Sequence, residues 1–432
     1  MKTMSRLAAA VAAILVIGSL AHAADWPQWR GPDRTGAIEG GPALADAWPK
    51  EGPVKVWESE PLQCGGPGGC ASPVVADGRM YVYATEQKDG KKTEVVLCLD
   101  AATGKTLWKV QGPSKTENGS STIAVSGGRC YGLGDESAYC LDAATGKEIW
   151  KVRCAGGNGS PLVEDGLVVV MADELTAFDA VQGVFAWTQP AVKGGNNSPV
   201  VWRSGRKKYV IYNNNGTRQI ACAGLADGKV LWTVAGGGSE STPAVSGDIL
   251  VVATDKAGLT AYQLGLAKPQ EIWNMPDLKT VGASPVISKG RVYATAAGKN
   301  VCVDLQKGTV IWEGPNGGDY YNSPIISGDR LFAPSQSGLF QMIRAGTDKY
   351  EELASAKDLG VGPCTTPVVV DGKLYVRHEK GVACYDLTKG PAAPAAPVAP
   401  APAPAASQAS PAAAPAPAAP QASPAAPQGQ GK

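Results

Sequence analysis

The side chains that most often carry chemistry in proteins are few in this sequence, apart from cysteine. It holds ten cysteines but only two histidines, His22 and His378, and no Cys-x-x-Cys pair. Structural and catalytic metal sites need clustered Cys, His or acidic ligands, so no metal site is predicted. Nothing marks His378 as a catalytic base or any serine as a nucleophile. The glycine-rich stretches each lead into an expected strand rather than a helix, which argues against dinucleotide-binding loops.

A repeat organises most of the chain. A Ser or Thr, usually followed by Pro, opens a short apolar run that ends at an X-Gly turn. The eight anchor residues are Ser72, Thr122, Ser160, Ser198, Thr242, Ser284, Ser323 and Thr366. Successive anchors lie 38 to 50 residues apart, which is the period of a four-stranded propeller blade. We therefore predict an all-β fold, an eight-bladed β-propeller of four-stranded antiparallel blades.

Residues 72–110 form the clearest copy of the repeat. The alternation of apolar and polar residues predicts strands at 72–76, 79–85, 95–100 and 105–110, with a polar connection at 86–93. Proline cannot donate to a sheet ladder, so the Pro that follows most anchors marks an edge strand. In a propeller, that strand lines the axis.

Glycine-rich segments precede the anchors and are expected to meet at one end of the central channel. They carry amides, carboxylates and phenols that a small polar ligand could contact. The candidate residues for binding a ligand or partner are Asn158, Asn196, Asn197, Glu240, Asp319, Tyr320, Tyr321 and Asn322. The alternative is that these segments are ordinary polar connections in a solvated channel.

The turn between the third and fourth strands repeats almost word for word. Residues 99–105 and 141–147 both read Leu-Asp-Ala-Ala-Thr-Gly-Lys, where Asp can bind the turn amides and Gly supplies a positive φ. A tryptophan follows at a fixed offset and is expected to pack between blades. The structural motif residues are Asp100, Gly104, Trp108, Asp142, Gly146, Trp150, Trp187, Trp232, Trp273 and Trp312.

This turn resembles the tryptophan-docking motif of the pyrroloquinoline quinone (PQQ)-like repeat family, Ala-x-Asp-x-x-Thr-Gly-x-x-x-Trp. The resemblance covers roughly residues 48–390 and implies an eight-bladed propeller with W-shaped blades. It weakens in the seventh repeat, where residues 338–356 lack the Asp, the Thr-Gly and the Trp. Residues 25–32, Asp-Trp-Pro-Gln-Trp-Arg-Gly-Pro, resemble the start of many exported bacterial members. Trp26 and Trp29 are expected to pack on the propeller, with ligand contact as the alternative.

The eighth repeat stops after its third strand, near Asp386. Residues 54–58, Val-Lys-Val-Trp-Glu, read like the missing fourth strand. We predict that this segment, with Trp57 at the docking position, joins the last blade and closes the ring, which would leave few open edges.

Five cysteines fall at the Ala position of the docking motif and are interpreted as small buried residues on separate blades. They are Cys98, Cys140, Cys222, Cys302 and Cys384. Cys70 and Cys364 share another register, two residues before an anchor, and could form a disulfide across the ring closure. Pairing of Cys64 with Cys70 and free thiols throughout are the alternatives left open.

The two ends of the chain differ from the repeats. Residues 1–23 read as a signal peptide, with Lys2 and Arg6 before an apolar stretch and Ala-His-Ala at the end. Residues 24–51 are expected to pack on the propeller at 52–390, and the Ala- and Pro-rich residues 391–432 to form a disordered tail. Removing Lys2, Arg6 and Lys432 from the 40 basic residues leaves 37 against 39 acidic ones. This balance gives no reason to expect nucleic-acid binding.

Two functions follow from these patterns. The first is an exported, monomeric, non-catalytic propeller, in the periplasm, the cell envelope or outside the cell. It would bind another envelope or secreted protein, with no cofactor and no transmembrane span, and resemble the quinoprotein-like scaffold branch that includes the assembly factor BamB. The second is a small-ligand protein: a PQQ-dependent oxidoreductase with calcium, or a sugar-binding protein. The blades are short and no Cys-Cys dipeptide is present, which favours the scaffold.

Overall fold

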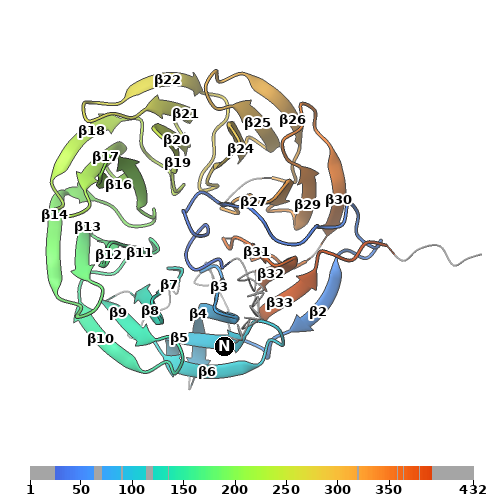
Figure 1. The fold of residues 1–432 in the computed structure, drawn as a ribbon, viewed down its shortest axis with the longest axis horizontal. Helices are drawn as coiled ribbons and strands as arrows, with labels where there is room; N and C mark the ends of the chain where they lie inside the picture. Colours follow the sequence, from blue (N-terminus) through green and yellow to red (C-terminus); the bar gives the residue numbers. More distant parts are fainter. Residues whose placement is uncertain are drawn as a thin grey trace, which may run out of the picture. The chain divides into compact units, whose positions relative to one another are not determined.

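The predicted propeller is confirmed. A computed structural model of the protein describes residues 25–62, 71–88, 91–112, 120–134, 136–318, 321–357, 359–362, 364–378 and 380–391. In this part of the chain the strands form eight sheets, arranged as a ring of blades (Figure 1). No helix among the described residues is long and apolar enough to cross a membrane.

Each blade runs from a short strand at the axis to a strand at the circumference. Blade 1 comprises β3 (Val74–Ala76), β4 (Arg79–Lys88), β5 (Lys91–Asp100) and β6 (Thr106–Gln111), and blade 2 comprises β7 (Ala124–Ser126), β8 (Arg129–Leu133), β9 (Ser137–Asp142) and β10 (Glu148–Arg153). Blade 3 comprises β11 (Leu162–Glu164), β12 (Leu167–Ala172), β13 (Glu174–Asp179) and β14 (Phe185–Lys193), and blade 4 comprises β15 (Val200–Ser204), β16 (Lys207–Asn214), β17 (Gln219–Gly224) and β18 (Val230–Ala235).

The second half of the ring repeats this order. Blade 5 comprises β19 (Ala244–Ser246), β20 (Ile249–Thr254), β21 (Gly258–Gln263) and β22 (Gln270–Met275), and blade 6 comprises β23 (Val286–Ser288), β24 (Arg291–Ala296), β25 (Lys299–Asp304) and β26 (Val310–Pro315). Blade 7 comprises β27 (Ile325–Ser327), β28 (Arg330–Pro334), β29 (Leu339–Arg344) and β30 (Glu352–Lys357), and blade 8 includes β31 (Val368–Val370), β32 (Lys373–His378) and β33 (Gly381–Asp386). β1 (Ala37–Ile38) and β2 (Val54–Glu58) come from the N-terminal segment.

The prolines locate the axial strand correctly. The strands after the anchors, β3, β7, β11 and their equivalents, lie at a sheet edge, except that β1 pairs in parallel with β27. Successive axial strands contact each other around the ring, for example β3 with β7 and β3 with β31.

One expectation for the first blade was wrong. The segment 86–93 was expected to be a polar connection, but β4 and β5 stay paired out to Lys88 and Lys91. The ladder continues through the pairs Glu86–Thr93, Gln87–Lys92 and Lys88–Lys91, because backbone pairing in an antiparallel hairpin does not need apolar side chains.

The tryptophans join each blade to the next. The Trp108 indole donates to Ala143 O of blade 2 at 3.2 Å, and a Cβ added to Gly146 would lie 2.7 Å from the Trp108 ring. Gly146 has a φ of 72°, so the motif glycine is required both by its backbone conformation and by the neighbouring indole. Equivalent indole-to-carbonyl bonds join Trp57 to Ala101, Trp150 to Ala180, Trp187 to Leu225, Trp232 to Gly265 and Trp273 to Leu305.

The seventh blade, which lacks the motif, breaks this series. Trp312 of blade 6 is buried and its Nε1 has no hydrogen-bond partner among the described residues. Its ring packs instead against Tyr350, with the centroids 5.5 Å apart. Within blade 7, Ala354 lies opposite Met342, where other blades carry the tryptophan. Trp48 of the N-terminal segment stacks on Phe340 of this blade.

The motif cysteines lie opposite the docking tryptophans in the ladders. Cys98 pairs with Trp108 and Cys384 with Trp57, while Ala177 occupies the same place opposite Trp187. All five motif cysteines are at most 1% exposed, as the repeat alignment predicted. Burial raises the pKa of the Cys98 thiol to about 11, so it is a protonated core residue at neutral pH. Cys64 and Cys70 lie outside the described residues, so both disulfide pairings remain predictions.

The ring closes as predicted, because β2 pairs antiparallel with β33 as the outer strand of blade 8. Trp57 is buried, and its indole donates to Ala101 O of blade 1 at 3.2 Å. One short N-terminal strand therefore completes the last blade and connects it to the first.

Removal of this closing strand should destroy cooperative unfolding. Deleting residues 52–60 removes the outer strand of blade 8 and exposes the edge of β33, so we expect the sharp thermal transition to disappear. Trp57→Ala should lower the free energy of unfolding by about 3–5 kcal/mol, the range for a buried tryptophan. Calorimetry and urea titration measure both effects.

The neighbouring residue provides the matched control. Val56 lies on the same strand but is 45% exposed, so Val56→Ala should change stability by less than about 0.5 kcal/mol. A deletion variant that melts like the intact protein would contradict the closure.

Candidate functional site

Hydrogen bonds between axial anchors link neighbouring blades. The backbone amide of one anchor donates to the side-chain hydroxyl of the next anchor, as in Ser72 N to Thr122 Oγ1 at 2.9 Å. The described residues show six such links, the others being Thr122 to Ser160, Ser160 to Ser198, Thr242 to Ser284, Ser284 to Ser323 and Thr366 to Ser72. These bonds place a circle of hydroxyl groups around the channel.

Three polar side chains above this circle form a hydrogen-bonded chain across neighbouring blades. Asn158 Nδ2 donates to Asn196 Oδ1 at 2.9 Å, and Asn196 Nδ2 donates to Glu240 Oε1 at 2.5 Å. The glycine-rich segments themselves interlock, because the Asn158 amide donates to Gly195 O. We call the end of the channel that carries Asn158, Asn196 and Glu240 the axial rim.

The N-terminal segment enters the ring from the other end of the axial strands. Figure 1 shows it in dark blue, running across the centre of the ring. Trp26 pairs with Val75 of β3 through two backbone hydrogen bonds, and Pro27 O accepts the Val125 amide of β7. Trp29 Nε1 then donates to the hydroxyl of Thr242, the anchor of blade 5, at 3.1 Å. The Trp29 indole thus lies across the channel from blades 1 and 2.

Two buried arginines attach this segment to two separate blades, the third and the sixth. Arg34 Nη1 donates to Pro161 O at 2.7 Å and Nη2 to Ser160 O at 3.1 Å. Arg30 Nη1 donates to Ser284 O at 3.3 Å, and its Nη2 binds Pro285 O. Burial lowers the pKa of each guanidinium to about 9, so both still carry their charge at neutral pH. The carbonyl bonds offset part of the cost of burying two cations.

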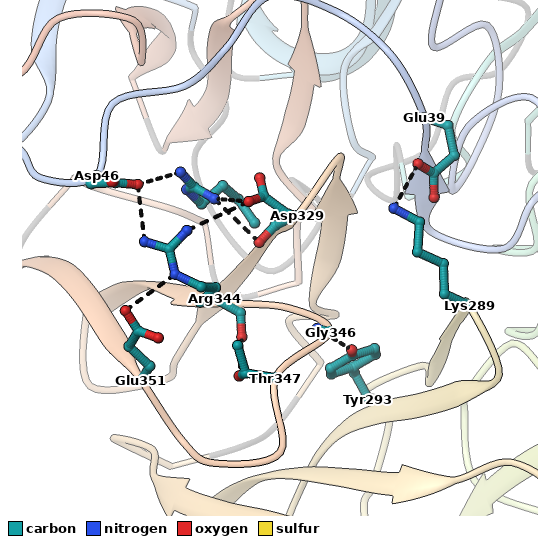
Figure 2. Close-up of polar contacts among 10 residues, drawn as sticks. Glu39, Asp46, Lys289, Tyr293, Asp329, Arg344, Gly346, Thr347 and Glu351 are labelled. Atoms are coloured by element: carbon teal, nitrogen blue, oxygen red, sulfur yellow. Dashed lines mark hydrogen bonds and ion pairs between the residues drawn. The ribbon is translucent and has the colours of Figure 1, made fainter.

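The segment is held further along by ion pairs. Figure 2 shows Asp46 and Asp329 beside Arg344, with Glu351 on the far side of that guanidinium. Arg344 Nη2 lies 3.1 Å from Asp46 and its Nε 3.1 Å from Glu351. Glu39 pairs with Lys289 at 3.1 Å. The mainly exposed carboxylates make each pair weak, so the buried arginines and Trp48 contribute more to holding the segment.

A pocket of about 280 Å³ lies between the rim and Trp29. Its lining comprises Trp29, Ser120, Thr122, Asn158, Ser160, Asn196, Ser198, Glu240, Thr242, Gly282, Tyr321 and Cys364. The Tyr321 ring packs where a Cβ on Gly282 would lie, 2.0 Å away, so the wall requires glycine at that position. Trp29 thus makes the N-terminal segment the floor of this pocket.

Four of the candidate residues line this pocket: Asn158, Asn196, Glu240 and Tyr321. Asn197 and Asn322 are buried, and their amides bind backbone carbonyls, Ser239 and Ser241 for Asn197, and Gly362 and Thr365 for Asn322. These two side chains hold neighbouring rim segments together. Asp319 and Tyr320 lie outside the described residues.

Sequence reasoning left the hydroxyl circle out of the candidate site. Thr122, Ser160, Ser198 and Thr242 were identified only as anchors of the repeat, yet all four line the pocket. Their position at the start of the axis-lining strand was the signal that could have placed them there. His378 lies elsewhere, in blade 8, with Nε2 3.4 Å from Glu58.

The pocket chemistry does not fit PQQ with calcium. The described lining residues include one carboxylate and no Lys or Arg, whereas PQQ carries several carboxylates that need cationic partners. Calcium takes six to eight oxygen ligands, commonly with several carboxylates, and no cluster of three acidic, His or Cys residues occurs among the described residues.

A family comparison agrees with the repeat. The family model described as outer membrane protein assembly factor BamB (PQQ_2) matches residues 91–206 and 204–393. The chain belongs to this family. BamB of Shewanella oneidensis is 28% identical over 188 residues, which is 38% of this chain and 47% of that relative. The match therefore spans less than half the length of the curated relative.

Solved structures share the fold of this BamB-family chain. BamB from Moraxella catarrhalis has a TM-score of 0.59 at 15% identity, covering 76% of this chain and 96% of that one. A europium-containing methanol dehydrogenase has a TM-score of 0.62 at 15% identity, covering 82% and 89%. A quinohemoprotein alcohol dehydrogenase from Comamonas testosteroni has a TM-score of 0.61 at 16% identity, covering 86% and 81%. At these identities the likeness concerns the fold alone.

The floor of the pocket should depend on the buried arginines. Arg34→Ala removes the donors to Ser160 O and Pro161 O, at about 1–3 kcal/mol for each unsatisfied carbonyl. It also relieves the cost of burying a cation, so we expect a net loss of about 2–4 kcal/mol in the free energy of unfolding. Urea titration measures it. Arg206→Ala is the control, because Arg206 is exposed, and equal midpoints for the two variants would contradict this role.

Proposed function

We propose that the protein is an exported, non-catalytic scaffold that binds another protein of the cell envelope at its axial rim. Residues 1–23 would direct it out of the cytoplasm, and the Ala- and Pro-rich tail from residue 391 would act as a spacer. Family membership supports an envelope location, since the relative is named an outer membrane assembly factor.

The observation that carries the non-catalytic role is the floor of the axial channel. The N-terminal segment occupies one end of the channel through buried arginines and Trp29. What remains is a small pocket whose described lining holds one carboxylate, no cation and no metal-binding cluster. Such a lining offers neither counter-charges for a quinone nor a paired acid and base.

The rim is the surface we assign to the partner. It exposes Val281, an apolar side chain that is 42% exposed, and the Val281 carbonyl accepts the Glu240 amide at 2.8 Å. An apolar group beside a fixed polar network gives a partner both contact area and orientation.

Photo-crosslinking in cells tests the partner surface. A photoreactive residue at Val281 should give a discrete adduct with an envelope protein. The same residue at Val310, 47% exposed and at the start of the outer strand of the same blade, should give none. An adduct at Val310 alone, or at neither position, would refute the rim as the binding surface.

Reconstitution tests the absence of quinone chemistry. The purified exported protein, incubated with PQQ and calcium and then desalted, should retain no quinone absorbance and reduce no dye. Retained quinone together with dye reduction in the presence of an alcohol or sugar would replace the scaffold with an oxidoreductase.

A further inference from the structure

The axial pocket offers both hydrogen-bond donors and acceptors. The hydroxyl oxygens of Thr122, Ser160 and Ser198 each accept a backbone amide, and that of Thr242 accepts the Trp29 indole. A hydroxyl whose oxygen accepts a hydrogen bond still has its own proton to donate. Within the described residues, none of these four hydroxyls donates to a protein acceptor, so all four protons are available to a ligand.

The rim offers both acceptors and donors. Asn158 Nδ2 donates to Asn196 Oδ1, and Asn196 Nδ2 donates to Glu240 Oε1, which leaves Asn158 Oδ1 and the second carboxylate oxygen of Glu240 as acceptors. Each amide nitrogen also keeps a second N–H. A ligand in this pocket can therefore accept hydrogen bonds at the circle of anchors and both donate and accept them at the rim.

Charge and shape narrow the ligand class. The single carboxylate and the absence of Lys and Arg from the described lining disfavour phosphates and carboxylates. A metal cation would find one carboxylate, that of Glu240, in the described lining, whereas calcium sites commonly have several. Neutral hydroxyl groups suit both ends because each can donate and accept. Trp29 and Tyr321 also line the pocket and supply aromatic surface, against which the apolar face of a cyclic ligand can pack.

We infer that the axial pocket binds one neutral sugar ring, either free or at the end of a glycan. The volume of about 280 Å³ is at the lower limit for small-molecule sites, about 300–1,000 Å³, which suits a single ring rather than a chain. The inference stands without the scaffold role, since it concerns the pocket and not the partner.

Isothermal titration calorimetry of the purified exported protein tests this inference with methyl glycosides of glucose, galactose, mannose and N-acetylglucosamine. At least one should bind with a stoichiometry of one. Glu240→Gln replaces an acceptor oxygen with a donor at the same volume, and should weaken that binding about tenfold or more, since hydrogen bonds to charged groups contribute about 1.5–3 kcal/mol. Asn158→Leu should weaken it similarly by removing the other rim acceptor.

Glu271→Gln provides the matched control, because Glu271 is an exposed residue on the outer strand β22 of the blade that Glu240 precedes. Its affinity should equal that of the parent protein, and thermal melts should show that all variants are folded. Absence of binding to every glycoside, or equal affinity in Glu240→Gln and the parent, would overturn the inference. If a glycoside binds but no partner is crosslinked, only the scaffold role is refuted. If a partner is crosslinked but no glycoside binds, only the sugar site is refuted.

Discussion

The hydrogen bond from one anchor amide to the next anchor hydroxyl determines how the centre of this propeller is built. At the six anchors that accept this bond it requires Ser or Thr, because the acceptor is a side-chain hydroxyl beside the neighbouring amide. It also explains the Pro that usually follows, since a residue without an amide proton leaves no unpaired donor in the channel. The indole-to-carbonyl bonds at the circumference likewise join each blade to the next through one side chain. An inner set of anchor bonds and an outer set of indole-to-carbonyl bonds thus connect neighbouring blades. Each blade of a propeller has little contact with blades that are not its neighbours.

The N-terminal segment supplies what eight repeats alone lack. Its β2 completes blade 8, Trp48 packs in the blade that has lost its own tryptophan, and Arg30, Arg34 and Trp29 close one end of the channel. Arginine suits this place because its planar fork can bind two adjacent carbonyls at once. The carbonyls are available because these residues precede the axial strands β11 and β23 and lie outside their ladders. One segment therefore connects ring closure to the shape of the pocket.

Local patterns predicted most of the fold, because each blade repeats the same strands, turns and docking residues. Even the closing strand could be found, since Trp57 keeps the offset of the other docking tryptophans. The pocket was harder to predict because its floor joins residues more than 200 positions apart, such as Trp29 and Thr242. A polar residue in a glycine-rich segment can also face either way: Asn196 lines the pocket while Asn197, its neighbour, holds the backbone of the next blade. Sequence spacing does not distinguish these two orientations.

The fold by itself does not separate a scaffold from an oxidoreductase, since BamB and two dehydrogenases have TM-scores of 0.59 to 0.62 with this chain. The difference must come from the axial residues that each chain places on the shared blades. Here two buried cations, Arg30 and Arg34, bind backbone carbonyls and do not line the pocket. Charges that could have neutralised an anionic cofactor are used to fix the floor. An axial pocket built in this way retains polarity without net positive charge, which favours recognition of neutral groups over redox chemistry.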